Sequence, residues 1–331
     1  MTELIFRETG YSNGYQEIET PILESADKVY DLTFSDSNVF FKFNLTDFDS
    51  SGNSVKQSDV LLRPEGTIPV CRYVARELSE KKNNVLPMSL QYSIVCYRNE
   101  PIDTLGEGKR REFNQLGAEK LGDKDKLFAD AEVMNYAYSV LRRLGINKED
   151  IRLRVNDITL FKQACETTNL SEELKINFQT LIDDYSKKTA EGNIVNINLP
   201  FPKGLTSALQ KEWSGFFSQY MSPEKATLAD ERLLNLYSIS ELIKDVPVLI
   251  DRSVVRGFSY YTGPVFQIDV RKNGVWRAEI GGGGRYDSLI GMYLAYLGIQ
   301  KEVPATGFAF GTERLTDLIN LRKDFKMTVG F

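Results

Sequence analysis

The sequence predicts an α+β fold in which helices flank a mainly antiparallel sheet. Strand-like runs are separated by short segments rich in turn residues, which is typical of antiparallel hairpins. Segments with helical spacing of apolar residues lie between and after these runs. At 331 residues, of which 42% are hydrophobic, the chain is long enough for one large domain with a smaller one attached.

The N-terminal part predicts a short helix followed by a hairpin. Residues 3–7 are expected to belong to a helix, and residues 14–24 to run extended through a proline. Residues 39–45 are rich in aromatic side chains and predict a strand. Residues 47–58 are rich in Asp, Ser, Gly and Asn, which is a turn signal, and the apolar pattern resumes at residues 60–62.

The next part predicts a helix, a pair of strands and a second helix. Residues 65–78 have nearly helical spacing after a proline. Residues 88–98 and 111–121 read as two strands joined by a polar, glycine-containing loop. Residues 129–144 form a strongly amphipathic pattern that stops at Gly145, as expected of a helix.

The residue pattern changes in the second half of the sequence. Residues 160–242 are dominated by helical patterns such as 171–188 and contain no candidate chemical motif, so we expect a helical insertion. A final helix follows Glu313. Three further strands are expected, at 246–250, 260–270 and 276–281. The predicted division is therefore a core of residues 1–159 and 243–331 and an insertion subdomain of residues 160–242.

Composition excludes several kinds of chemistry. The chain has no histidine, which excludes histidine-based triads, histidine general bases and histidine metal ligands. Cys71, Cys96 and Cys165 lack metal-ligand spacing, so we expect reduced thiols, no metal site and a cytoplasmic protein. A net charge of −5 argues against wholesale nucleic-acid binding. No apolar run reaches membrane-spanning length, so no membrane partner is expected.

The first candidate motif is the segment Arg63-Pro64-Glu65-Gly66-Thr67. Its carboxylate and hydroxyl lie two residues apart at a predicted strand-to-helix turn, where they could hold an ammonium group. The alternative is an ordinary helix start in which Glu65 or Thr67 satisfies backbone N–H groups, and this segment alone favours that alternative.

The second motif spans the pair of strands. Arg98 and the basic cluster of residues 109–111 are expected near a common rim, where arginines would suit a phosphate. Gln115 and Glu119 have equal parity on one strand and therefore share a face. The alternative, a solvated hairpin with surface charges, is equally compatible with these residues.

Three more motifs lie near the C-terminal end. Tyr260 and Tyr261 follow Arg256 closely and offer stacking and hydrogen bonds to a polar ring, although strand packing explains them as well. Four consecutive glycines at 281–284 permit close approach of a ligand, or a flexible turn. Arg314 lies near a helix start, where a cation suggests an anionic partner or a salt bridge.

The order of these motifs is more specific than any one of them. The series RPEGT, YRNEP…RREFNQLGAE, RGFSYYTG, GGGRYD and GFAFGTERL closely resembles the histidyl-tRNA synthetase catalytic domain, and GYQEIETPILE resembles the end of that family's motif 1. The resemblance implies a class II aminoacyl-tRNA-synthetase-type antiparallel sheet flanked by helices, with a helical insertion. It also implies a homodimer of the core.

The resemblance also implies roles for individual residues. Those that match the amino-group site are Glu65, Thr67 and Gln115. Those that match the imidazole pocket are Glu119, Tyr260, Tyr261 and Tyr286. In a synthetase, ATP with Mg²⁺ would contact Arg98, Glu100, Arg111, Phe113 and Arg314, and the groups that assist the chemistry would be Arg98, Arg256 and Arg314.

Departures from the family leave two hypotheses. Asn114 stands where the synthetases usually have histidine, and Ser259 where they usually have aspartate. The segment after Leu315 is too short for a C-terminal anticodon-binding domain, so histidine tRNA is not expected as a partner.

The first and favoured hypothesis is that the chain resembles the ATP phosphoribosyltransferase regulatory subunit. Such a chain would be a histidine sensor without cofactor or catalytic residues. It would form a hetero-oligomer with the catalytic subunit of the first step of histidine biosynthesis, and it would show no histidine-dependent ATP–pyrophosphate exchange. The second hypothesis is a synthetase core that still makes histidyl-adenylate.

Overall fold

An eight-stranded sheet forms the centre of the chain. The computed structural model describes residues 1–34, 39–80, 85–102, 105, 109–166, 171, 179, 182–183, 223–243, 245–256 and 259–320. Across the sheet the strands follow in the order β1 (Gln16–Glu17), β5 (Met88–Tyr97), β6 (Glu112–Leu121), β11 (Ala305–Gly311), β10 (Val275–Arg285), β9 (Pro264–Lys272), β7 (Ile151–Asp157) and β8 (Val248–Ile250). The two outermost pairs, β1–β5 and β7–β8, are parallel, and all the inner pairs are antiparallel.

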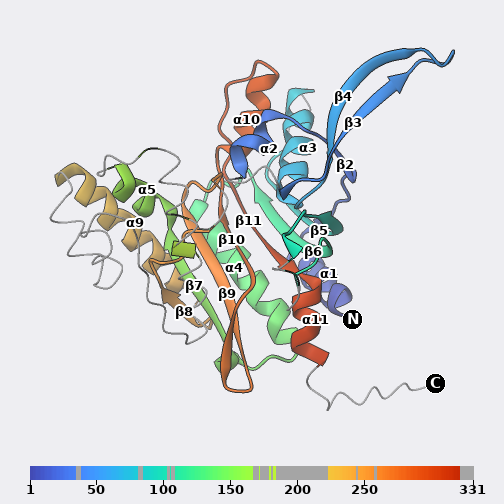
Figure 1. Cartoon of the computed structure of the whole chain (residues 1–331). Coiled ribbons are helices and arrows are strands. Elements are labelled where there is room, and N and C mark those ends of the chain that lie inside the picture. Colours follow the sequence, from blue (N-terminus) through green and yellow to red (C-terminus); the bar gives the residue numbers. More distant parts are fainter. Residues whose placement is uncertain are drawn as a thin grey trace.

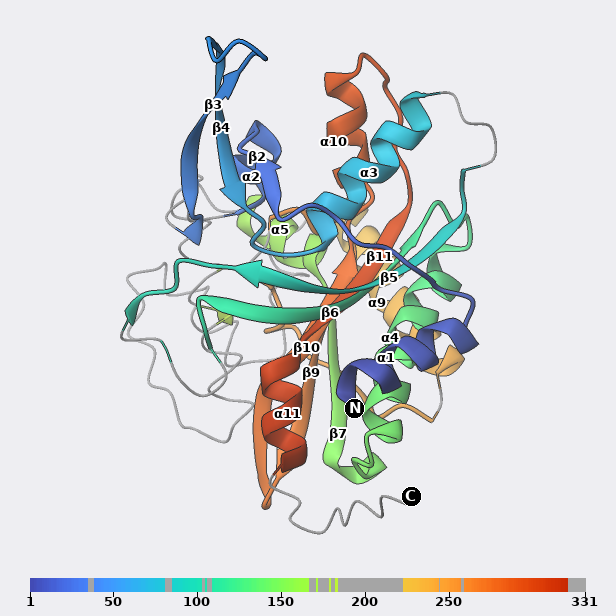
Figure 2. The same cartoon turned by 90° about the vertical axis from the view of Figure 1, so that its right-hand side faces the viewer.

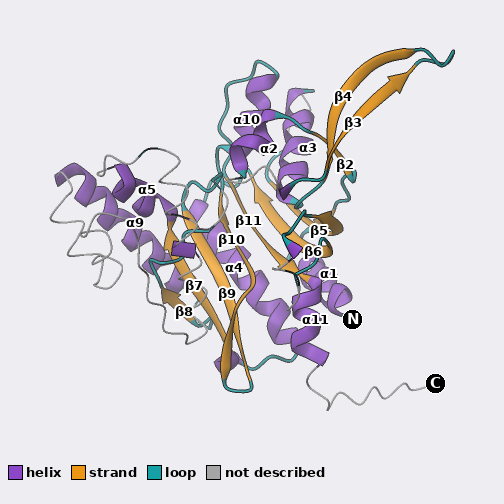
Figure 3. Cartoon of the chain, viewed as in Figure 1, coloured by secondary structure: helices purple, strands orange, loops and turns teal. Residues whose placement is uncertain are grey.

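Helices cover the sheet in two groups, each with its own hydrophobic cluster (Figures 1 and 3). Helices α3 (Thr67–Ser79) and α10 (Leu289–Tyr296) pack against each other, and with α2 (Lys28–Thr33) they enclose the first cluster. The second cluster lies between the sheet and helices α1 (Thr2–Ser12), α4 (Lys126–Arg143), α9 (Pro223–Leu242) and α11 (Thr312–Asn320). The predicted α+β architecture, a largely antiparallel sheet flanked by helices, is confirmed.

A second, three-stranded sheet extends away from the body (Figures 1 and 2). Its order is β2 (Leu23–Ser25), β4 (Ser54–Leu62) and β3 (Lys42–Phe48). The predicted hairpin is present but longer than expected, because its turn occupies only residues 49–53. There the Asp49 carboxylate accepts the backbone N–H groups of Ser51 and Asn53, at 2.9 and 2.8 Å. Polar residues that the sequence suggested as turn belong instead to two exposed strands.

Some elements were not predicted, among them helix α2, strand β7 and helix α10. Strand β7 lies directly before the proposed insertion. Its sequence IRLRVND alternates apolar and polar residues, as expected of a strand, although the polar side chains of Arg154, Asn156 and Asp157 are buried as well. Helix α10, with the sequence LIGMYLAY, has no polar face, and therefore no helical period marks it.

The proposed insertion lies mostly outside the described residues. Its described parts are helix α5 (Ile158–Glu166), helix α9 and the single positions 171, 179, 182 and 183. The boundary between core and insertion therefore stays a prediction. None of the described helices combines the length and the apolar composition needed to cross a membrane.

The four glycines at 281–284 form part of strand β10 rather than a turn. They pair with β11 on one side and with β9 on the other. A Cβ atom on Gly283 would overlap the carbonyl oxygen of Gly307, and a Cβ atom on Gly282 would overlap the carbonyl oxygen of Phe266. The glycines therefore allow the three backbones to approach closely, as expected of glycine inside a strand.

We expect the change Gly283→Ala to destabilise the chain by about 3 kcal/mol, because the overlapping atom belongs to a backbone that cannot rotate away. The control is Gly311→Ala in β11, where the nearest atom to a new Cβ is Arg314 Cγ at 4.0 Å. Its expected effect is within about 0.5 kcal/mol. Urea unfolding of both variants measures the difference, and equal stability of the two would contradict this view of the strand.

Candidate active site

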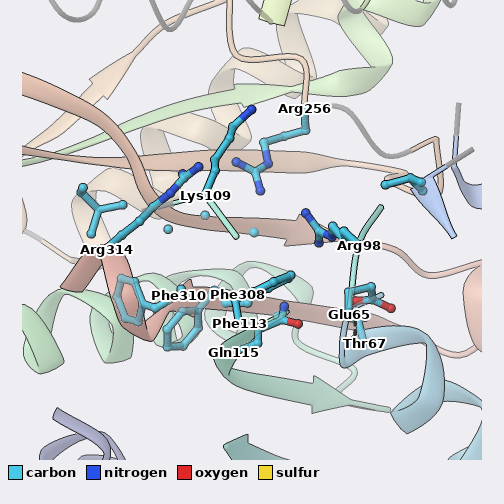
Figure 4. Close-up of a pocket in the computed structure, with 18 of the residues that line it drawn as sticks. Glu65, Thr67, Arg98, Lys109, Phe113, Gln115, Arg256, Phe308, Phe310 and Arg314 are labelled. Atoms are coloured by element: carbon cyan, nitrogen blue, oxygen red, sulfur yellow. Dashed lines mark hydrogen bonds between the residues drawn. The ribbon is translucent and has the colours of Figure 1, made fainter. Parts of the chain in front are cut away.

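A cavity of about 380 Å³ opens between the ends of β5, β6, β10 and β11 and the start of α3. It collects nearly all of the site residues expected from the sequence. Those that line it are Glu65, Thr67, Arg98, Glu100, Phe113, Gln115, Arg256, Tyr260, Tyr261, Tyr286 and Arg314. In Figure 4, Glu65 and Thr67 lie at one end of this space and Arg314 at the other. The two remaining predicted residues, Glu119 and Arg111, do not line it.

Glu65 lies just before helix α3 and also lines the cavity. Its carboxylate accepts the backbone N–H groups of Thr67 at 2.7 Å and Ile68 at 2.5 Å. The helix-start role that the sequence favoured is therefore present, and the same residue lines the cavity. Burial raises the pKa of Glu65, while these two N–H bonds and the charge of Arg98 oppose that rise.

Glu119 lies directly behind the cavity wall. Its side chain is fully buried and accepts hydroxyl hydrogen bonds from Thr67 (2.7 Å), Tyr92 (3.0 Å) and Tyr286. Burial raises the pKa of Glu119 to about 8, against the lowering effect of the bonds from Tyr286 and Thr67. Gly307 makes room for this carboxylate, because a Cβ atom there would overlap it. Two residues of the cavity wall are thus held by one buried acid.

Gln115 is oriented by a cysteine that sequence reasoning had assigned no role. The Cys96 sulfur lies 3.1 Å from Gln115 Oε1. Burial raises the pKa of Cys96 to about 12, so the thiol keeps its proton and donates to the amide oxygen. The oxygen retains a second lone pair, and the amide can still accept a hydrogen bond from a ligand.

Three buried tyrosines form one wall of the cavity. The rings of Tyr260 and Tyr261 are tilted at 52° with centres 4.7 Å apart, and the Tyr260 and Tyr286 rings meet edge-on at 5.8 Å. Edge and tilted contacts of this kind present ring faces to a neighbouring group. Burial raises the pKa of each, so all three hydroxyls stay protonated and can donate.

Cations border the same cavity. In Figure 4, Arg98, Arg256, Lys109 and Arg314 approach the same space from different elements. The Arg98 Nε donates to the Pro64 carbonyl at 2.9 Å, and its guanidinium lies 5.1 Å from the centre of the Phe113 ring. Planar, anchored guanidinium groups suit phosphate oxygens.

Unlike these cations, Arg111 does not line the cavity. It is exposed, and its Nε donates to the Glu100 carbonyl oxygen at 3.1 Å. This bond supports the segment after β5 that carries Glu100, which itself lines the cavity. A contact between Arg111 and a ligand stays a prediction.

The positions that depart from the family pattern do not face the ligand space. Neither Asn114 nor Ser259 lines the cavity. The Asn114 backbone N–H donates to Glu313 Oε1 at 3.0 Å, and the Ser259 hydroxyl donates to the Leu32 carbonyl at 2.5 Å.

Some lining residues were not predicted from the sequence. Glu313 and Phe310 lie within a motif that had drawn attention only for its arginine. Asp183 comes from the stretch in which no chemical motif had been recognised, and its side chain is 6% exposed. Among the described residues, no group of three or more acidic or cysteine side chains has metal-binding geometry.

The fold and the cavity define a class II aminoacyl-tRNA-synthetase-type catalytic domain. The family model described as histidyl-tRNA synthetase matches residues 6–315. The chain belongs to this histidyl-tRNA synthetase family.

Curated relatives carry the name histidine–tRNA ligase. The protein of Methanocaldococcus jannaschii is 32% identical over 314 residues, which cover 93% of this chain and 69% of the relative. The protein of Metallosphaera sedula is 29% identical over 95% of this chain and 70% of its own length.

Solved structures with the same fold carry two kinds of description. A Bacillus halodurans protein described as an ATP phosphoribosyltransferase regulatory subunit/histidyl-tRNA synthetase has a TM-score of 0.69 at 23% identity, over 96% of this chain and 78% of that one. A histidine–tRNA ligase subunit of Alicyclobacillus acidocaldarius has a TM-score of 0.68 at 21% identity, over 98% and 93%. At these identities the likeness establishes the fold alone.

Proposed function

We propose that the cavity binds free histidine beside ATP and that the chain forms histidyl-adenylate. The observation that carries this proposal is one continuous cavity lined by acidic and amide groups, by tyrosines and by several arginines. A site for a free amino acid alone would need only the first two parts.

The histidine ammonium group would lie at the acidic end. Glu65 and Gln115 offer oxygen acceptors there, and Thr67 adds a hydroxyl. The imidazole would lie against the tyrosine wall, with the buried Glu119 carboxyl group behind Tyr286. A polar ring matched in this way would discriminate against apolar amino acids, because they would leave the buried polar groups unpaired.

The reaction itself needs little from the protein beyond position and charge. A carboxylate oxygen of histidine would attack the α-phosphorus of ATP. As the new O–P bond forms, the bond to the β-phosphate oxygen breaks, and pyrophosphate leaves with the bonding electrons. Arg98 and Arg256 would stabilise the charge on the α-phosphate, and Arg314 the leaving pyrophosphate. No general base is required, since the attacking carboxylate is already ionised. Mg²⁺ carried by the phosphates would neutralise further charge.

A second candidate is the regulatory subunit that the sequence favoured. The absence of histidine from the chain and the replacements Asn114 and Ser259 support it, and the Bacillus halodurans structure is described by both roles. In that case histidine occupancy would change the activity of a phosphoribosyltransferase partner, and the partner would change histidine affinity by the same factor.

Histidine-dependent ATP–pyrophosphate exchange separates the two candidates. We expect exchange that saturates with histidine and is absent with other amino acids. Histidine binding without exchange, together with a co-purifying phosphoribosyltransferase, would replace adenylate formation by the regulatory role. A chain that does not bind histidine in calorimetry would rule out both.

A further inference from the structure

The loop between β8 and β9 carries three residues of the cavity wall. Arg256, Tyr260 and Tyr261 all belong to it, and its described residues form no strand or helix. Backbone carbonyl groups outside regular structure need partners elsewhere. Three side chains from the segment that begins with β7 supply them.

Asn156 at the end of β7 holds the start of the loop. Its side-chain Nδ2 donates to the carbonyl oxygens of Arg252 at 3.1 Å and Val254 at 3.0 Å. The residue is buried, with 1% of its surface exposed. This anchor belongs to the sheet and fixes where the loop begins.

Gln179 holds the part of the loop that carries the arginine. Its Nε2 donates to the carbonyl oxygens of Val255 at 3.2 Å and Arg256 at 2.5 Å. Arg256 has a φ of 52°, in the left-handed region that residues other than glycine rarely adopt. Such a backbone conformation persists only where its surroundings hold it, and the bond to its own carbonyl group is one such constraint.

Lys162 in α5 holds the part that carries the tyrosines. Its ammonium donates to the carbonyl oxygens of Tyr261 at 2.8 Å and Ser259 at 3.3 Å. These two carbonyls flank Tyr260, so both tyrosine backbones are fixed from outside the cavity. The Lys162 side chain is exposed and fills no core space, and it can be replaced without opening a cavity.

We propose that Lys162 and Gln179 are positioning residues for ligand binding, with Lys162 setting the tyrosine wall and Gln179 setting Arg256. Neither lines the cavity, and each acts through backbone carbonyl groups. The proposal deepens the proposed function and rests on it. It assigns a role to the segment after β7, in which the sequence showed no motif.

The two residues act on different parts of the ligand, because the tyrosines would contact the imidazole, whereas Arg256 would contact the histidine carboxylate that later attacks the α-phosphate. This difference gives a test that a general loss of stability would not reproduce. Histidinol has the imidazole and the amino group of histidine but lacks the carboxylate. Lys162→Met is expected to weaken histidine and histidinol alike, by about tenfold, the equivalent of one or two lost hydrogen bonds. Gln179→Leu is expected to weaken histidine by about tenfold and histidinol by less than about twofold.

Calorimetry with both ligands measures these ratios on the full chain. Lys162→Arg, which keeps a charged donor, should restore affinity. Lys148→Met is the matched control, because Lys148 is half exposed and pairs at 3.8 Å with Asp245, away from the cavity. Equal losses of both ligands in Gln179→Leu, or unchanged affinity in Lys162→Met, would overturn the proposal.

Hydrogen exchange of the peptide that covers residues 251–263 provides a readout without ligand. We expect faster exchange in Lys162→Met and Gln179→Leu and wild-type exchange in Lys148→Met. If the wild-type chain does not bind histidine, the proposed function fails, while this measurement still decides the positioning role. Unchanged exchange in both variants would refute it.

Discussion

Replacement of Glu119 by glutamine is expected to weaken histidine binding about 100-fold, which corresponds to about 2–3 kcal/mol for buried polar groups left without a hydrogen-bond partner. The carboxylate accepts from three hydroxyls, those of Thr67, Tyr92 and Tyr286. Glutamine keeps the volume but brings an NH₂ group among three donors. At least one hydroxyl must then turn away, and both Thr67 and Tyr286 face the cavity.

Calorimetry measures the change, with Glu80→Gln as the matched control. Glu80 is exposed on the surface and pairs with Arg76 at 3.1 Å, and its loss should leave affinity unchanged. The larger truncation Glu119→Ala should weaken binding at least as much, since it leaves all three hydroxyls without this acceptor. Unchanged histidine affinity in both Glu119 variants would refute the assignment of the pocket.

Glu119→Gln is also expected to change how the stability of the chain depends on pH. The pKa of Glu119 is raised from 4.5 to about 8 in the folded chain. Between these values the folded state keeps a proton that the unfolded state has lost, so this group makes the chain less stable as pH rises from about 4.5 to about 8. In Glu119→Gln that contribution disappears. Melting temperatures measured across this pH range would then fall less steeply for the variant than for the wild type.

The sequence assigned Glu119 to the site, but it could not show that Glu119 lies behind the cavity wall. Its equal parity with Gln115 on β6 put both side chains on one face, and both are buried there. That Thr67 and Tyr286 lie between Glu119 and the cavity depends on how α3 and the segment after β10 pack onto the sheet. No local pattern contains that information, because the contacts join residues far apart in the chain.

Other site residues escaped prediction for related reasons. Cys96 meets Gln115 only through the register of β5 with β6. Asp183 reaches the cavity from a stretch whose local pattern is simply helical. The motifs themselves were informative because their residue types fit the structure around them. The glycines of β10, for example, are explained by the close approach of β9 and β11, and the sequence alone left a flexible turn as an alternative.

Arg98→Lys is expected to reduce histidine-dependent exchange about 1000-fold, the size of effect seen when one donor to a developing charge is removed. Lysine keeps the positive charge but loses the planar fork and the Nε donor. In this chain both features are used, since Nε is anchored to the Pro64 carbonyl and the guanidinium lies over the Phe113 ring. The charge of a lysine at this position would have no fixed orientation toward the phosphate.

The control is Arg76→Lys, in which an exposed arginine paired with Glu80 is changed in the same way. Its exchange rate should match the wild type. Histidine affinity measured without ATP should change less than about threefold in Arg98→Lys, as expected when an interaction is made only with the phosphate side. A parallel fall in histidine affinity and exchange would instead mean that Arg98 acts on the amino acid through the Pro64 turn, which leads directly into Glu65. The ratio of the two losses therefore decides whether the cation side of the cavity serves ATP or only shapes the histidine site.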